Sequence, residues 1–385
     1  MGLGCIETFF TRVSKSISDT LRDIDSFTFY GCLFIIGFGL ISVLTIAIPI
    51  SLRIHVSAFG FIAKHIVFLG FSIFLMLFFA NSKKGEILFY SNILLCLALV
   101  MLIAVIPFGI NIKGASRWIG FGGISIQPSE ILKPFFIIVN AKILGSKGDL
   151  DRSRILKSLG LLSVICFFLI LQPDFGSLIL FAMICVFQLF LAGMRLKYIF
   201  SLGGTVIGLM VFAFFAFPHV KSRVMTMVGG QEVGYQLKKS QESIKSGGFF
   251  GKGLGNGTIK YHLPDSHTDF IFSTICEEFG YLFAIILICL YFVIATRNMI
   301  LITQCTRDKV SIYTVYGNMF LFFCQAFINI GVNLKILPNK GMTLPFVSYG
   351  GSALISMGIV IGITMCFTKE SRYINNQYSK LYSPF

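Results

Sequence analysis

Long apolar runs separated by short polar connections make up most of this chain of 385 residues. About ten runs can be distinguished, at residues 27–50, 64–81, 87–108, 129–145, 158–173, 175–194, 198–217, 269–296, 312–333 and 345–367. Most are long enough to cross the hydrocarbon core of a bilayer as an α-helix, which takes about 20 apolar residues. The strands of a membrane β-barrel would instead alternate between apolar and polar positions over about 10 residues. The pattern therefore predicts an all-α polytopic membrane protein with about ten transmembrane helices.

Polar segments divide the chain into three parts. Residues 1–26 form an N-terminal segment, 27–368 a single membrane domain, and 369–385 a C-terminal tail. Lys and Arg gather in the two terminal segments and in alternate connections, which is typical of cytoplasmic loops. We therefore expect both termini to be cytoplasmic. One long connection, residues 218–268, falls on the outer side between the seventh and eighth helices.

Composition excludes a water-soluble globular protein. Hydrophobic residues make up 55% of the chain and charged residues 13%, whereas soluble domains have about 25% charged residues. The net charge of +15 would suggest nucleic-acid binding in a soluble protein. In a polytopic protein, cytoplasmic Lys and Arg explain most of it, so we expect no nucleic-acid partner. The ten cysteines show no metal-binding spacing.

Charged residues occur at the outer ends of the third and fourth runs. Arg117 precedes the sequence QPSEILK at 127–133. Ser129 is expected to cap the fourth helix, with Glu130 and Lys133 on one face because they are three residues apart. This arrangement is either an ion pair that fixes a short helix, or a site where Lys133 and Arg117 present cations to a phosphate at the membrane surface.

A second group of charges surrounds Asp269, which lies where the outer loop meets the eighth run, just after His267. A carboxylate at this place would either cap the helix or act as a general base. Glu277 and Glu278 follow within the apolar run, where a charge needs a partner or a role. Lys133 is one candidate partner for Glu277.

Three further stretches are irregular. The sequence QPDFG at 172–176 is typical of a tight turn, and we interpret Asp174 as a cap of the next helix. Residues 333–352 contain two prolines and several glycines, which predicts a re-entrant or loop element with Lys340 as another outer cation. The glycine-rich run 246–256 follows no predicted strand, so we do not interpret it as a nucleotide site.

Several of these stretches carry a resemblance to a known family. GASRWI, QPSEILK, QPDFGS, GGFFGKGLGN, LPDSHTDFIF, EEFG and LPNKGMTLPFVSYGGS occur in this order. Together they resemble the SEDS family of shape, elongation, division and sporulation proteins over residues 27–368. The sequence KGMTLP at 340–345 is closer to the division branch, that of FtsW, than to the elongation branch of RodA type. Three positions depart from the family pattern, namely Asp265, Asn339 and Ala353.

The resemblance implies a ten-helix peptidoglycan glycosyltransferase of the bacterial cytoplasmic membrane. Its members polymerise lipid II, a disaccharide-peptide on undecaprenyl pyrophosphate, at the outer face of that membrane. For the division branch, the site is the septum. The implied partners are a class B penicillin-binding protein of the FtsI transpeptidase type and other divisome membrane proteins. The family's essential aspartate falls on Asp269, its RW arginine on Arg117, and its QPSE-x-x-K pair on Glu130 and Lys133.

A pyrophosphate leaving group needs no general acid, so one base is sufficient for the reaction. We expect Asp269 to be this catalytic base. The expected substrate-binding cations are Arg117, Lys133 and Lys340. Supporting roles are expected for Glu130, Glu277 and His267. A divalent cation, Mg²⁺ or Mn²⁺, could assist, and no organic cofactor is expected.

Other functions fit the apolar composition. A lipid II flippase is the main alternative, but it should carry charged residues through the membrane midplane rather than mainly on the outer side. An elongation-type polymerase, a non-catalytic scaffold for a transpeptidase, and a ligase of lipid-linked glycans are further alternatives.

Overall fold

The structure of the chain is a computed structural model. It describes residues 23–54, 57–112, 115–121, 124–146, 148, 150–200, 203–204, 215, 231–337 and 341–382. Most of the predicted helix at 198–217, the first part of the long outer loop, and Lys340 therefore lie outside the described residues.

The described chain is almost entirely helical, which confirms the predicted fold class. Its helices are α2 (Ser26–Ile54), α3 (Ala58–Asn81), α4 (Lys84–Phe108), α5 (Pro128–Leu144), α6 (Arg152–Leu171), α7 (Phe175–Leu191), α10 (Gln231–Gly247), α11 (Ile271–Cys305), α12 (Lys309–Asn333) and α13 (Gly351–Tyr382), with a 3₁₀ turn, η1, at Ile259–Tyr261. Seven of these are long and apolar enough to cross a membrane, and α7 is a shorter apolar helix. Every predicted run except 198–217 coincides with one of them. The sequence placed the start of the fifth run too late, because α6 already begins at Arg152.

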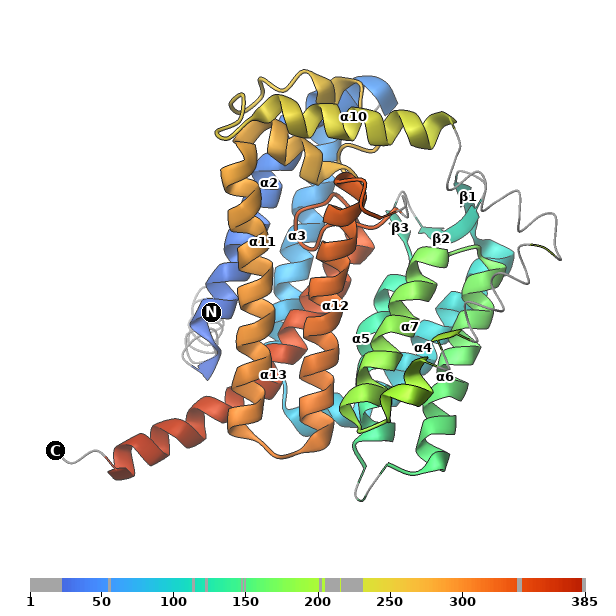
Figure 1. Cartoon of the computed structure of the whole chain (residues 1–385), viewed down its shortest axis with the longest axis vertical. Coiled ribbons are helices and arrows are strands. Elements are labelled where there is room, and N and C mark those ends of the chain that lie inside the picture. Colours follow the sequence, from blue (N-terminus) through green and yellow to red (C-terminus); the bar gives the residue numbers. More distant parts are fainter. Residues whose placement is uncertain are drawn as a thin grey trace, which may run out of the picture.

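The helices form two groups in Figure 1. One contains α2, α3, α11, α12 and α13, and the other contains α4 to α7. Contacts of α5 with α12 and α13 join them. In an apolar stretch of 18 residues within α13, 89% is buried, whereas only 17% is buried in the corresponding stretch of α6. Helix α13 therefore lies in the core and α6 at the lipid-facing periphery. The start of α2 and the end of α13 lie at one end of the bundle, and α10 lies across the opposite end (Figure 1).

A small antiparallel sheet lies between α4 and α5 and was not anticipated from the sequence. Its strands are β1 (Ile110–Ile112), β2 (Ala115–Phe121) and β3 (Ile124–Ile126), in the order β1-β2-β3. In its register Trp118 is opposite Ile110, and Ile119 is opposite Ile126. The sheet fixes the path of the strand that carries Arg117.

Helix α11 is interrupted at Gly280, where φ is 81° and ψ is 179°. This left-handed φ suits glycine, which has no Cβ. The interruption frees the carbonyls of Glu277 and Glu278, which accept hydrogen bonds from the backbone N–H groups of Lys252 and Gly253 at 2.9 and 3.0 Å. The two glutamates therefore lie in a short helical piece beneath the outer loop, and not deep in one continuous membrane helix as the sequence suggested.

Candidate active site

A cavity of about 420 Å³ lies between elements that are far apart in the sequence. The sheet, α5, the α6–α7 turn, the segment before α11, helix α12 and the segment before α13 all line it. Its charged and amide side chains are Arg117, Gln127, Glu130, Lys133, Asp174, Asp265, Asp269 and Gln325. Segments far apart in the sequence therefore bring together three of the predicted residues, Asp269, Arg117 and Lys133, and the supporting Glu130.

Lys133 and Glu130 form an ion pair on the first turns of α5. Lys133 Nζ lies 2.6 Å from Glu130 Oε1, and the lysine side chain is only 1% exposed. Lys133 also donates to Gln325 Oε1 at 3.5 Å. Glu130 Oε2 has no hydrogen-bond partner among the described residues, although it is buried. The shared helix face was predicted correctly, and the second carboxylate oxygen is left buried without a hydrogen bond in the described part of the chain.

Arg117 is the more exposed cation of the cavity, with 28% of its side chain accessible. Its Nη1 lies 3.8 Å from Asp174 Oδ1. Its Nη2 and Nε donate to the carbonyls of Pro173 and Gln172. The α6–α7 turn thus fixes the guanidinium and leaves part of it facing the cavity.

Asp174 combines the capping role predicted from the sequence with a place in the cavity. Its Oδ1 accepts from Ser177 N at 3.3 Å, which caps α7. Its Oδ2 accepts from Gln127 Nε2 at 3.1 Å and from Ser129 Oγ at 3.2 Å. The expected cap of α5 by Ser129 is wrong, because Gln127 occupies the N-cap and Ser129 lies inside the helix, bonded to Asp174.

Asp269 is half-buried just before α11, and hydrogen bonds hold its backbone on α12. Asn329 Nδ2 and Asn333 Nδ2 donate to the Asp269 carbonyl at 3.0 and 2.8 Å. The preceding carbonyl, of Thr268, accepts from Ser348 Oγ at 2.6 Å. Asp269 does not cap the helix, because Phe270 is the N-cap residue. Its carboxylate borders Gly341, where a Cβ would lie 3.2 Å from Asp269 Oδ2.

The two other supporting residues predicted from the sequence do not line this cavity. His267 packs among aromatic rings, with centroids 5.6 Å from Phe61 and 5.7 Å from Tyr349. Tyr349 itself lines the cavity, so His267 supports its wall. Glu277 is paired with Lys252 at 3.3 Å. The suggested pairing of Glu277 with Lys133 is therefore wrong, since Lys133 contacts Glu130.

Sequence reasoning missed Gln325. Its Nε2 donates to Thr343 Oγ1 at 3.1 Å, which joins α12 to the loop that follows it. The available signal was an amide inside an apolar run, where a polar side chain needs a partner.

The carboxylates of the cavity do not form a preorganised metal site. No group of three His, Cys, Asp or Glu residues suited to hold an ion occurs within the described part of the chain. A divalent cation at this site would need further oxygen ligands from the substrate.

Comparisons with known proteins agree with the sequence motifs. A family model described as cell cycle protein, of FtsW, RodA and SpoVE type, matches residues 26–373. The chain is 33% identical over 353 residues to the probable peptidoglycan glycosyltransferase FtsW of Idiomarina loihiensis, covering 89% of this chain and 86% of that protein. It is 32% identical over 344 residues to the protein of the same name from Escherichia coli O6:H1, covering 87% and 83%.

Solved structures share the fold. One chain of a peptidoglycan synthase complex that coordinates polymerization and crosslinking matches with a TM-score of 0.75 and 22% identity, covering 90% of this chain and 98% of that chain. The rod shape determining protein RodA of Thermus thermophilus matches with a TM-score of 0.68 and 22% identity, covering 90% and 97%. The family model, which matches residues 26–373, shows that this chain belongs to the FtsW/RodA/SpoVE family of cell cycle proteins, the SEDS family expected from its motifs.

Proposed function

We propose that this chain is a peptidoglycan glycosyltransferase that polymerises lipid II into glycan strands for septal wall synthesis. Relatives that match most of the chain carry the name peptidoglycan glycosyltransferase FtsW. The observation that carries the chemical proposal is the cavity in which the Asp269 carboxylate shares one space with Arg117 and Lys133.

In the proposed reaction, Asp269 takes the proton from the 4-hydroxyl of the acceptor's GlcNAc. That oxygen bonds to the anomeric carbon of the donor sugar with inversion. The bond from this carbon to the pyrophosphate oxygen breaks, and undecaprenyl pyrophosphate leaves with the electron pair. Because the leaving group is already a stable anion, one base is sufficient, whereas glycoside hydrolysis uses a pair of carboxyl groups.

The cations of the cavity hold the pyrophosphate in this proposal. Arg117 is the best placed, because it is partly exposed and its planar guanidinium suits phosphate oxygens. Lys133 contributes less to phosphate binding than Arg117 does. It is paired with Glu130, and because the net charge of the pair is close to zero, the pair attracts a phosphate more weakly. Lys340 is retained as a third cation, although it lies outside the described residues.

A divalent cation fits this scheme only together with the substrate. Mg²⁺ is usually held by one or two carboxylates plus substrate phosphates, and not by an all-protein cage. We propose that such an ion enters with the pyrophosphate, with Asp269 or Glu130 as its protein ligand, and that its chemistry is charge neutralisation of the leaving group.

The described membrane helices are those of a multi-pass membrane protein. We further propose that the cavity faces the outer side of the cytoplasmic membrane at the septum. The proposed partner is a class B penicillin-binding protein of the FtsI type, together with other divisome proteins. Support comes from the FtsW names of the relatives and from the fold similarity to a chain of a peptidoglycan synthase complex.

The lipid II flippase remains the second candidate. Strands β2 and β3 contribute residues to the cavity, and they lie toward the end of the bundle where α10 lies (Figure 1). A catalytic site at one membrane face needs this arrangement, whereas a transport path needs polar groups along its length.

The decisive experiment compares the purified wild-type chain, Asp269→Asn and Glu242→Gln with labelled lipid II and a cognate transpeptidase. Glu242 is a suitable control, because it is a carboxylate on α10 paired with Lys239 and does not line the cavity. We expect Asp269→Asn to form no polymer and Glu242→Gln to polymerise normally. Polymer from Asp269→Asn would rule out the base, and a flipping signal abolished by Asp269→Ala in liposomes would favour the transporter.

A further inference from the structure

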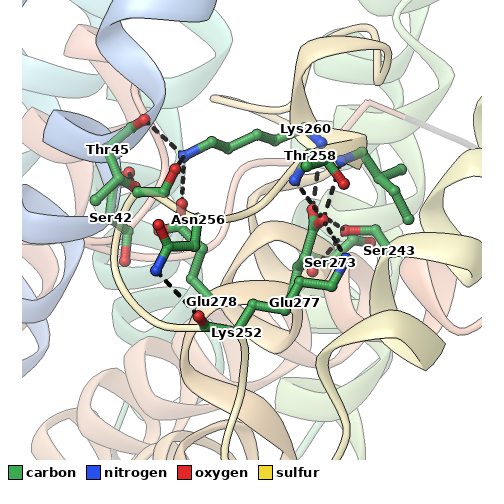
Figure 2. A network of polar contacts seen from close by, with 12 residues as sticks. Ser42, Thr45, Ser243, Lys252, Asn256, Thr258, Lys260, Ser273, Glu277 and Glu278 are labelled. Atoms are coloured by element: carbon green, nitrogen blue, oxygen red, sulfur yellow. Dashed lines mark hydrogen bonds and ion pairs between the residues drawn. The ribbon is translucent and has the colours of Figure 1, made fainter.

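Lys260 and Glu278 are 18 positions apart, and their side chains form a buried ion pair that closes the chain on itself. Both side chains are almost fully buried, at 0% and 1% exposure. Lys260 Nζ also donates to the carbonyl of Thr45 in α2 at 3.0 Å, and to that of Gly255 at 3.4 Å. Figure 2 shows the lysine extending from the outer loop to Thr45 and Glu278.

Glu277 reinforces this closure from the adjacent position. Its Oε1 accepts from the backbone N–H groups of Thr258 and Ile259 at 2.8 and 2.9 Å, and its Oε2 accepts from that of Lys260 at 3.2 Å. Ser243 Oγ and Lys252 Nζ donate to the same carboxylate at 3.1 and 3.3 Å (Figure 2). The carboxylate is thus fully occupied in holding the loop.

We name Lys260, Glu277 and Glu278 the clasp. Asp269 lies in the middle of the segment that the clasp closes, residues 260–278. Closing a segment of this length removes conformational freedom from everything between its ends. The Asn329 and Asn333 amides hold the Asp269 carbonyl from α12, so the clasp fixes the ends of this segment and α12 fixes its middle.

A buried ion pair makes such a closure specific. If one partner is removed, the other is left as an uncompensated charge in a dry site, which is strongly unfavourable. Opening the loop therefore has to expose both charges to water at once. Arrangements in which one charge is exposed and the other stays buried are disfavoured. The contact with Thr45 further ties the loop to a membrane helix that does not line the cavity.

We propose that the clasp is a positioning device for the catalytic carboxylate, holding Asp269 where it meets the acceptor hydroxyl. This inference rests on the proposed role of Asp269 as the base. The clasp residues touch neither substrate nor reacting atoms, and they act through the segment that carries Asp269. Small misplacements of a reacting group lower the rate strongly, by about 100-fold for a displacement near 1 Å.

The test uses three variants, which are Lys260→Met/Glu278→Gln, the milder Glu277→Gln, and a control at the other end of the same helices. The control is Asp25→Asn/Arg297→Met, which removes the two-point ion pair that joins the start of α2 to α11 at 2.7 Å. It loosens α2 and α11 as the clasp variant does, but far from Asp269. Each protein is purified as the monodisperse full-length chain and assayed with its transpeptidase partner and lipid II.

We expect kcat per folded molecule to fall about tenfold or more in the clasp double variant and less in Glu277→Gln, with KM for lipid II within about twofold. The control should keep the wild-type kcat. Amide hydrogen exchange of residues 258–270 should become faster in the clasp variants and remain unchanged in the control. Wild-type kcat in both clasp variants, or unchanged exchange in 258–270, overturns the proposal.

Asp269→Asn is assayed in parallel to separate the two ideas. If it is inactive while the clasp variants keep full kcat, the base stands and the clasp proposal is overturned. If it is active, the base is overturned, and the clasp loses its proposed purpose whatever the exchange experiment shows.

Discussion

Lys133 Nζ lies 2.6 Å from Glu130 Oε1 within a wall of the cavity, and the lysine is almost completely buried. The cation is therefore available to a substrate only together with its carboxylate. Because α5 carries both residues three positions apart, the pair is built into one helix face. Its second oxygen, Glu130 Oε2, is buried and has no hydrogen-bond partner among the described residues.

The first prediction concerns the stability of this pair. Glu130→Gln or Lys133→Met leaves one buried charge without its partner, and we expect each to lower the free energy of unfolding by about 3–5 kcal/mol. The double variant should recover a large part of that loss. Denaturation in detergent measures both effects. Removing the partly exposed pair Lys239–Glu242 on α10 is the control and should change little. Single variants as stable as the wild type would contradict the burial argument.

The second prediction concerns Arg117. Lysine keeps the charge but cannot bond the carbonyls of Gln172 and Pro173 while facing a phosphate. We expect Arg117→Lys to raise KM for lipid II about tenfold, with a smaller effect on kcat, because a bidentate charge-assisted contact is lost. Arg154→Lys, at the start of α6 and away from the cavity, is the matched control. An unchanged KM would remove Arg117 from the substrate site.

The third prediction isolates a steric effect in the outer loop. Gly251 and Gly255 both have a φ of 79°, but a Cβ at Gly251 would lie 2.2 Å from the Glu278 carbonyl oxygen, whereas Gly255 has open space. Gly255→Ala should cost about 1 kcal/mol of unfolding free energy for its left-handed backbone alone. Gly251→Ala should cost clearly more, because the added Cβ would force the loop away from the Glu278 carbonyl next to the interruption in α11. Equal losses in a denaturation experiment would show that the contact does not matter.

The fourth prediction is a pH dependence at the opposite end of the bundle. Burial raises the pKa of Asp25, but hydrogen bonds from Arg297 and Thr28 outweigh it, so the pKa lies below its ordinary value of 3.8. A carboxyl group whose pKa is lower in the folded than in the unfolded state stabilises the fold fully at pH values above its pKa in the unfolded chain. This stabilisation is lost as the pH falls through its pKa in the folded chain. Wild-type thermal stability should therefore fall more steeply than that of Asp25→Asn on acidification below about pH 4. Parallel curves for the two proteins would contradict this.

Much of the fold was predictable because the bilayer imposes a strong constraint on sequence. A membrane helix must be apolar over its whole length, so the runs reveal the helices, with errors mainly at ends such as that of α6. Local spacing also predicted that Glu130 and Lys133 would share a face, and that Asp174 would cap α7. The sheet that carries Arg117 was missed, because β1 and β3 are only three residues each.

The apolar runs were enough to predict an all-α polytopic membrane protein, and the motifs were enough to predict its family. Which charges meet depends on the tertiary structure. Glu277 binds Lys252 and the backbone of 258–260, and Glu278 binds Lys260, because the interruption at Gly280 lets the outer loop pack against α11. Pairing between distant segments depends on how helices and loops pack in space, and no spacing along the chain records that. The same packing places Asp269 in one cavity with Arg117 and Lys133.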